Sequence, residues 1–511
     1  MDIIQNFKSA VWIKQCWNLL KMKNKSEEIL KQCRSIPKEE GLIDLNSLIN
    51  NSNSFPIPFP IHTVRLSELR KRKPLEKIMR NIESTYALVH ERVLLQMANF
   101  LVFKREYGSS VERKLYKDMT VPQFVDRLLF KRAVTFMYPE DFFVLLTGER
   151  DTGGWESVGT LQQKPPLLLE NCLSYDEMKL SAMLYVSGFT YCINDGKRNN
   201  SGVVDEDGVE EEAVIIGLIG ARFERPRKMD FEDVLITKDQ NTVQNGFGQP
   251  DNNTDSWISR WRQMWSEFYD IPSLLYKDLP DIRTDEKKYL TNYVRIDDNT
   301  VFSNEVYYKR ISVLADTTLL EAEFRAKETG KNAFINVIGC GLGVWRISSH
   351  QSDVYILTFI QRIEDFLKKG LIDHVSDINF SYIRVSDDVR GIFQQSSSGT
   401  VGRKLIHHEG HPKGGVNIQL ENREPSSKLS GEHAGKLLVM TYPWDGNAHP
   451  GNEFWIGSLS GSGDPAAACS TQVSELHNAH INTTLRGDTV RVAAEGGVRP
   501  LREYCLTHTR Q

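Results

Sequence analysis

The sequence predicts an α/β protein with a mixed central sheet flanked by helices and a helical N-terminal extension. Residues Ala213 to Phe223 read AVIIGLIGARF, a near-continuous apolar run typical of a strand buried on both faces. A second short apolar strand, Ala333 to Ile338, leads into glycines, a helix and a further strand at 378–382. This order is that of a crossover unit. Before about residue 135, apolar residues recur at helical spacing instead.

Composition sets limits on the class of protein. The chain has 511 residues, of which 40% are hydrophobic and 25% charged, as in a globular protein with a sizeable core. A net charge of −4 argues against general nucleic-acid binding. We find no signal peptide and no apolar stretch of the roughly 18 residues that a membrane span needs. The seven cysteines are scattered without a C-x-x-C pair, so we predict a cytoplasmic protein without disulfides or zinc.

Shifts in composition predict three parts: a helical region at 1–120, a catalytic domain at 121–482 and a tail at 483–511. The Pro- and Asn-rich stretch Asn50 to Pro60 is predicted to be a linker. The helical region either recognises a partner, forms a lid, or simply supports the core. Residues 395–434 are polar and irregular, which predicts a surface insertion. The tail contains no motif from which we predict a structure or a function.

Capping residues mark several helices. Ser174 and Glu177 form a predicted capping box for a helix that runs to about Val186, ahead of a strand at Phe189 to Ile193.

Two longer helices are predicted around the second strand. Asp316 is a candidate N-cap for a helix that ends at Gly330, because glycine suits the left-handed position after a helix. Ser348 and Gln351 are a candidate capping box for a helix closed by Gly370.

A glycine loop follows the strand that ends at Ile338. It consists of Gly339, Cys340, Gly341, Leu342, Gly343, Val344 and Trp345. Glycines between a strand and a helix let backbone N–H groups converge on a phosphate. The spacing is neither the Rossmann fingerprint nor a P-loop. A close-packing turn is the alternative interpretation.

A carboxylate loop, residues 444–464, follows the strand-like Leu437 to Thr441. It carries Asp445, Glu453 and Asp464, with Trp444, Asn447 and Asn452 as further candidates for ligand contact. Carboxylates between aromatic walls suit a ribose, because they can bind hydroxyls, orient water and stabilise an oxocarbenium-like centre. A raised pKa would make one of them a general acid.

Three of the acidic residues also have a purely structural interpretation. Asp464 precedes Pro465 and could be a helix N-cap with proline at the first helical position. Asp445 precedes Gly446 and could be a turn residue. Glu475 could simply lie on the exposed surface of a helix.

Together the two loops resemble those of the macrodomain/poly(ADP-ribose) glycohydrolase superfamily, in the reverse order along the chain, which indicates circular permutation. A closer resemblance is to the MavL-like family. It rests on GCGLGVW at 339–345 and YPWDGNAHPGNEFWIGSLSGSGDPAAA at 442–468, with SYDEM at 174–178 and GARFERPRKMD at 220–230. The resemblance covers roughly residues 120 to 482.

This resemblance implies removal of ADP-ribose from a modified arginine, with ubiquitin as the known class of protein substrate. It implies that the glycine loop holds the diphosphate while Asp445, Glu453 and Asp464 surround the distal ribose. One carboxylate would activate water at C1″ and another would assist departure of the guanidinium, with no metal or cofactor. Two alternatives are a non-catalytic module that binds ADP-ribose or an NAD metabolite, and a helical scaffold for protein partners.

Overall fold

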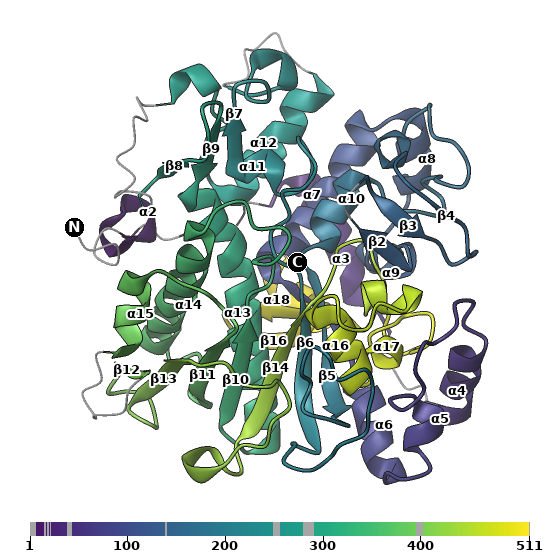
Figure 1. The fold of residues 1–511 in the computed structure, drawn as a ribbon. Coiled ribbons are helices and arrows are strands. Elements are labelled where there is room, and N and C mark those ends of the chain that lie inside the picture. Colours follow the sequence, from purple (N-terminus) through teal and green to yellow (C-terminus); the bar gives the residue numbers. More distant parts are fainter. Residues whose placement is uncertain are drawn as a thin grey trace.

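A mixed sheet lies at the centre of the computed structural model (Figure 1), which describes residues 7–14, 17, 20, 22–37, 43–137, 140–248, 256–279, 291–394 and 402–509. Its strands are β1 (Tyr86–His90), β5 (Leu184–Tyr191), β6 (Glu212–Leu218), β10 (Ala333–Ile338), β11 (Val375–Ser381), β12 (Arg403–His407), β13 (Gly415–Leu420), β14 (Leu437–Pro443), β15 (Arg491–Ala494) and β16 (Gly497–Pro500). Within the described ranges the order is β12-β13-β11-β10-β14-β6-β5-β1-β15-β16. The predicted α/β class is confirmed.

The middle of this sheet is parallel. β14 lies between β10 and β6 and is parallel to both, with Ile335 opposite Val439 on one side and Val439 opposite Val214 on the other. β10 is also parallel to β11, and helix α14 (His350–Lys369) connects them. The predicted crossover unit is therefore confirmed. β5, β12 and β16 run antiparallel to their partners β6, β13 and β15.

Helix α13 (Asn304–Thr329) packs against β1, β6, β10, β11 and β14, and α14 lies beside it (Figure 1). The other helices are α2 (Val11–Lys14), α3 (Asn24–Gln32), α4 (Leu45–Asn53), α5 (Leu66–Leu69), α6 (Leu75–Glu83), α7 (Glu91–Tyr107), α8 (Ser110–Tyr116), α9 (Val121–Phe130), α10 (Tyr175–Ser181), α11 (Phe231–Val234), α12 (Trp257–Tyr269), α15 (Asp387–Gln394), α16 (Gly463–Ser470), α17 (Val473–Leu476) and α18 (Leu501–His508). None of the helices in the described part of the chain combines the length and apolar character that a membrane span requires.

Two small sheets flank the central one (Figure 1). One consists of β2 (Thr135–Met137), β3 (Phe142–Val144) and β4 (Arg150–Asp151), and the other of β7 (Leu235–Thr237), β8 (Tyr293–Arg295) and β9 (Thr300–Ser303). The first matters for the site, because its strand β2 contacts the carboxylate loop.

Several predicted helix ends are confirmed. Ser174 and Glu177 form the capping box of α10. Gly330 and Gly370 end α13 and α14 in the left-handed conformation, with φ of 65° and 64°. Only half of the predicted box before α14 forms: Gln351 Oε1 accepts from the backbone N–H of Ser348 at 2.9 Å, while the Ser348 hydroxyl bonds to a ring nitrogen of His350 instead.

Two predicted boundaries are wrong. Helix α10 ends at Ser181, before Val186, because Leu184–Tyr191 pairs with β1 and β6 and is buried on both faces of the sheet. Asp316 is no cap: α13 begins at Asn304, and Asp316 lies within it, buried against Arg362 of α14 at 2.6 Å. No glycine or proline interrupts the helix between these two positions, so helix formation continues through them.

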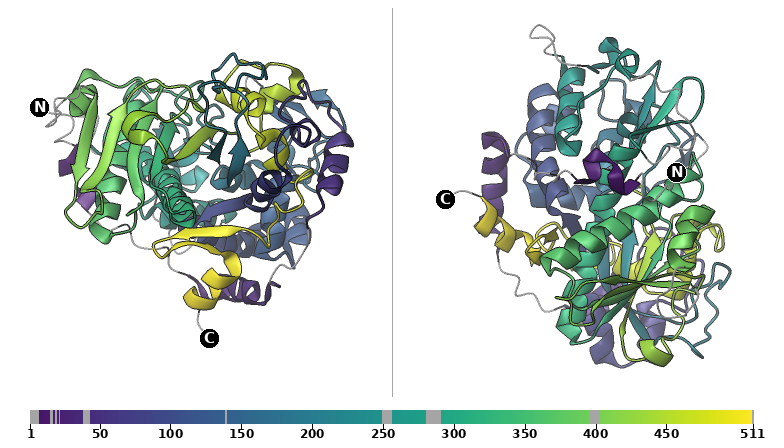
Figure 2. Two further views of the ribbon diagram at one scale, coloured as in Figure 1. Left: turned by 90° about the horizontal axis from the view of Figure 1, so that it is seen from below. Right: turned by 90° about the vertical axis from the view of Figure 1, so that its left-hand side faces the viewer.

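The sheet takes strands from all three predicted parts of the chain. β1 comes from the helical region, and β15 and β16 come from the tail; Figure 2 shows β16 and α18 in yellow at one side of the sheet. The predicted surface insertion at 395–434 is wrong in its described part, because β12 and β13 extend the sheet there; residues 395–401 lie outside the described ranges.

Glu475 does not decorate a surface. Its side chain is buried in α17 and accepts from the Ser52 hydroxyl, the backbone N–H of Leu66 at 2.5 Å and Arg65 at 3.4 Å. It thereby fixes the helical region to the sheet domain. The six described cysteines are free and buried, while Cys16 lies outside the described residues.

Candidate active site

The site lies where three parallel strands end. β6 ends at Leu218, β10 at Ile338 and β14 at Pro443, and parallel pairing brings these ends to one edge of the sheet. The glycine loop and the carboxylate loop leave β10 and β14 there, and residues 219–230, the β6 loop, leave β6. Ligand sites of open α/β sheets form at such carboxyl ends. The two loops predicted from sequence therefore adjoin one another.

The structure brings the three predicted acids together. Asp445 and Asp464 are 3% and 4% exposed, whereas Glu453, in the short helix Asn452–Ile456, is partly exposed. Burial raises the pKa of all three carboxyl groups. For Asp464 the charges of Glu453 and Asp445 add to burial, and its pKa lies well above the usual range. The three acids thus lie within electrostatic reach of one another.

The helix-cap interpretation of Asp464 is wrong. Ser462 is the N-cap of α16, and its hydroxyl accepts from the backbone N–H of Asp464 at 3.3 Å. Asp464 lies in the first helical turn, where its Oδ1 accepts from the N–H of Gly451 at 2.7 Å. Its carboxyl group therefore points back into the carboxylate loop.

Asp445 combines a turn role with a charged contact. Its Oδ1 accepts from the backbone N–H of Asn447 at 2.8 Å, as in an Asx turn. Its Oδ2 pairs with Arg222 Nη1 at 3.0 Å. The turn interpretation is therefore correct but incomplete, because one carboxylate oxygen faces a buried cation.

The other predicted contacts of the loop are buried. Trp444 donates from its ring nitrogen to the Ala448 carbonyl at 3.0 Å, and the amide of Asn452 binds both the N–H and the carbonyl of Phe136. These two side chains hold the loop's shape. The buried amide of Asn447 has no hydrogen-bond partner among the described residues, and its contact with ligand stays a prediction.

The glycine loop is tightly packed at one point and open at the next. Gly341 has φ of 77°, and a Cβ there would lie 2.9 Å from the Ala221 carbonyl oxygen. Gly343 has no atom within 4 Å of such a Cβ, and Val344 is 89% exposed. Close packing thus explains why residue 341 is a glycine. At Gly343, by contrast, the space beside the backbone is open to a ligand. Burial raises the pKa of the Cys340 thiol to about 12, so it is unreactive.

Sequence reasoning missed two buried arginines. Arg222 pairs with Asp445, and its guanidinium carbon lies 5.2 Å from the ring centre of Trp345. Arg132 lies 4.1 Å from the ring centre of Trp444 and donates to the backbone carbonyl of Asp445 at 3.4 Å. Burial lowers the pKa of Arg132 to about 9, although the charge of Asp445 opposes this. Arg222 belongs to the 220–230 motif, which offered a signal for its importance but not for its role.

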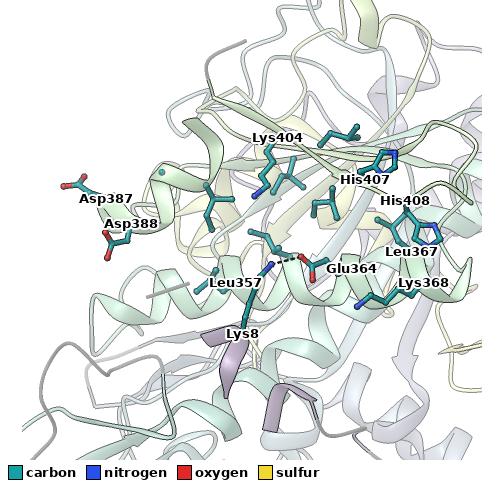
Figure 3. Close-up of a pocket in the computed structure, with 16 residues that line it drawn as sticks. Lys8, Leu357, Glu364, Leu367, Lys368, Asp387, Asp388, Lys404, His407 and His408 are labelled. Atoms are coloured by element: carbon teal, nitrogen blue, oxygen red, sulfur yellow. Dashed lines mark hydrogen bonds and ion pairs between the residues drawn. The ribbon is translucent and has the colours of Figure 1, made fainter. Parts of the chain in front are cut away.

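A cavity of about 730 Å³ adjoins the glycine loop. Its walls come from the residues after Trp345, the start of α14, the loop after β11 and the hairpin of β8 and β9, and include Arg346, Ser348, Arg384 and Val385. A larger cavity of about 910 Å³ lies between α14, α15 and β12 (Figure 3). Lys8 pairs with Glu364 in it at 3.0 Å, and none of the predicted site residues lines it.

The acidic cluster is not arranged as a metal site. In the described ranges, no three His, Cys, Asp or Glu side chains are placed so that they could hold a metal ion. The chemistry that the arrangement offers is that of carboxyl groups with different proton affinities beside an open backbone loop.

The chain is similar to known proteins over most of its length. A family model described as ADP-ribosylhydrolase MavL-like matches residues 46–507. Two curated proteins of Drosophila melanogaster, ADP-ribosylarginine hydrolase CG2909 and ADP-ribosylarginine hydrolase CG3568, are each 38% identical over 488 residues. These matches cover 94% of this chain and 93% and 92% of the respective relatives. The chain belongs to the MavL-like family of ADP-ribosylhydrolases.

Proposed function

We propose that this protein hydrolyses the bond between C1″ of ADP-ribose and a nitrogen of a protein arginine. The observation that carries the proposal is the cluster of Asp445, Glu453 and Asp464 beside the glycine loop, in a chain of an ADP-ribosylhydrolase family. The two fly relatives are named ADP-ribosylarginine hydrolases, which supports arginine as the modified residue.

The ligand is proposed to lie along the carboxyl edge of the sheet. The open backbone around Gly343 binds the diphosphate, the distal ribose reaches the carboxylate loop, and the adenosine enters the cavity near Arg346 and Arg384. That cavity, at about 730 Å³, has the size of a small-molecule site.

The carboxyl groups differ in the way the reaction needs. Asp445 forms an ion pair with Arg222, which favours its charged form, so in this proposal it accepts a proton from the water whose oxygen attacks C1″. The C1″–N bond breaks, and its electrons remain on the guanidine nitrogen. Asp464, whose pKa burial and its acidic neighbours raise well above the usual range, holds a proton and gives it to that nitrogen. Glu453, the most exposed of the three, faces the incoming guanidinium.

The reaction is proposed to need no metal or cofactor, since carboxyl groups and water supply its proton transfers. Ubiquitin modified on arginine is the proposed first protein substrate, and the cytoplasm is the proposed location, in keeping with the free cysteines of the described chain. We expect hydrolase activity to persist in the presence of a chelator. We also expect the protein to be recovered in the cytosolic fraction of cells.

The test is release of ADP-ribose from arginine-modified ubiquitin and from a modified arginine peptide. Asp464→Asn should lower kcat by at least about 100-fold, the lower end of a general acid–base contribution, while calorimetry still detects ADP-ribose binding. Asp126→Asn is the matched control, because Asp126 also accepts a glycine N–H, that of Gly487 at 2.7 Å, and belongs to neither loop of the site. Binding of ADP-ribose without turnover by the wild-type protein would instead identify a non-catalytic binding module.

A further inference from the structure

Arg222 stands between the two loops of the site. It is 5% exposed, and its Nη1 lies 3.0 Å from Asp445 Oδ2 while its Nε lies 2.9 Å from Glu224 Oε2. Its guanidinium carbon lies 5.2 Å from the ring centre of Trp345 and 4.8 Å from that of Phe136. One side chain therefore contacts a carboxylate of the reaction centre and the last residue of the glycine loop.

The position of Arg222 is itself fixed by buried groups. Its backbone N–H donates to Asp230 Oδ2 at 2.9 Å, and Asp230 Oδ1 accepts from Arg310 Nε at 2.8 Å. Arg310, from α13, also donates to the carbonyls of Ile219 and Ala182 at 3.0 Å each. Because α13 packs along the middle of the sheet, the β6 loop that carries Arg222 is held by a rigid element.

We propose that Arg222 is the positioning residue of the reaction: it holds the Asp445 carboxylate in one orientation and opposes its protonation, and it links that carboxylate to Trp345 of the glycine loop. The inference rests on the proposed function and adds the group that decides which carboxyl group carries the proton. A buried carboxylate with acidic neighbours takes up a proton unless a fixed cation opposes it. Arg222 supplies that cation at Asp445, and within the described residues no cation pairs with Asp464.

Among the charged groups around Asp445, Arg222 is the one that can position its carboxylate. The charged groups that face Asp445 are Arg222 and Glu224 of the β6 loop, Arg132 after α9, Asp141 between β2 and β3, and Glu453 and Asp464 of its own loop. Of the two cations, Arg132 donates to the backbone carbonyl of Asp445 and, among the described residues, forms no ion pair with the carboxylate. Within the described ranges, only Arg222 forms an ion pair with that carboxylate.

The test compares Arg222→Gln and Arg222→Lys with the wild-type protein on ADP-ribosylated arginine across pH 4 to 9. In Arg222→Gln, Asp445 loses its counter-charge, so kcat should fall about 100-fold or more and the acidic limb of its pH profile should move to higher pH. The Kd for ADP-ribose should change by a smaller factor than kcat. Arg222→Lys keeps the charge but loses the fork geometry, so it should restore the limb and part of kcat.

Arg362→Gln is the matched control, because Arg362 also pairs with a buried aspartate, Asp316 at 2.6 Å, away from the site. It should lower the melting temperature without moving the pH profile. An unchanged pH profile in folded Arg222→Gln overturns the inference. If that variant does not fold, an Arg222→Lys protein with the wild-type kcat overturns it. If the wild-type protein releases no ADP-ribose, the proposed function fails, and the pH dependence of ADP-ribose binding in the same variants decides the inference alone.

Discussion

Asp464 differs from its two acidic neighbours in how its charge is compensated. Its carboxyl group is buried and accepts from the N–H of Gly451, and among the described residues it takes part in no ion pair. Burial, followed by the charge of Glu453, raises its pKa well above the ordinary value. The folded protein therefore binds a proton at Asp464 over a pH range in which the unfolded chain has released it.

This difference predicts how stability depends on pH. Because the pKa of Asp464 is raised in the folded protein, this group contributes to the free energy of unfolding. The contribution is fully present below the unfolded pKa of about 3.9 and is lost as pH rises through the folded pKa. Asp464→Asn does not titrate, so the free energy of unfolding of the wild-type protein should fall relative to the variant as pH rises from 4. Urea unfolding at a series of pH values measures this.

Asp316→Asn provides a control of opposite sign. Burial alone would raise the pKa of Asp316, but Arg362 and His90 outweigh it and the folded pKa is lowered. The wild-type protein should therefore gain stability over Asp316→Asn as pH rises above the folded pKa. The same slope in both variants would contradict the assignment of Asp464.

At this scale the sequence located the acids but not their partners. Asp445, Glu453 and Asp464 share one aromatic-rich loop, so their grouping could be predicted from proximity along the chain. Arg222 and Arg132 are 223 and 313 positions from Asp445. The residues around an arginine in the sequence do not indicate a partner so far along the chain, since only the fold brings the two side chains together.

Among the elements, the glycine loop owes its shape to the β6 loop. A Cβ at Gly220 would lie 2.3 Å from the carbonyl carbon of Cys340, and one at Gly341 would lie 2.9 Å from the Ala221 oxygen. The two loops therefore approach one another through backbone, and glycine is required on both sides.

The loop offers a matched pair of substitutions. Gly341→Ala should lower the free energy of unfolding by about 1 to 3 kcal/mol, because its φ of 77° is strained for alanine. It should also weaken ADP-ribose binding. Gly343→Ala meets no atom within 4 Å and should leave stability unchanged, while its methyl group hinders the diphosphate. Calorimetry and thermal unfolding separate the two effects; equal stability of both variants would contradict the packing described for Gly341.

Elements with strong local signals could be predicted, and those defined by pairing could not. Gly330 and Gly370 marked helix ends because the left-handed conformation there favours glycine. β12 and β13 were not predicted, because a pair of strands at the edge of a sheet is only half buried and its sequence is therefore largely polar. β1 is five residues long and lies between two helices, so its helical surroundings concealed it.

In the whole molecule, the C-terminal tail completes the sheet. β15 pairs in parallel with β1, and α18 packs on β15 and β16. The tail buries Val490, Val492, Leu501 and Tyr504. Loss of these side chains would expose both an apolar surface and the edge of β1.

Deletion of residues 483–511 should therefore prevent folding to a soluble protein. Each large buried apolar side chain contributes about 2 to 5 kcal/mol, and several of them exceed a total stability of about 5 to 15 kcal/mol. Soluble yield and melting temperature are the measurements. Leu506→Asp is the control and should be neutral, because Leu506 of α18 is 49% exposed. A soluble truncated protein with the wild-type melting temperature would contradict this role of the tail.

The place of β14 in the sheet has a consequence for the timing of folding. Both of its neighbours, β10 and β6, are translated earlier, and neither pairs with the other. On the ribosome the centre of the sheet therefore remains open until β14 emerges, and the carboxylate loop emerges directly after it. The reaction centre thus forms only after β14 has been translated, and a prematurely ended polypeptide that stops before β14 lacks every proposed catalytic carboxyl group.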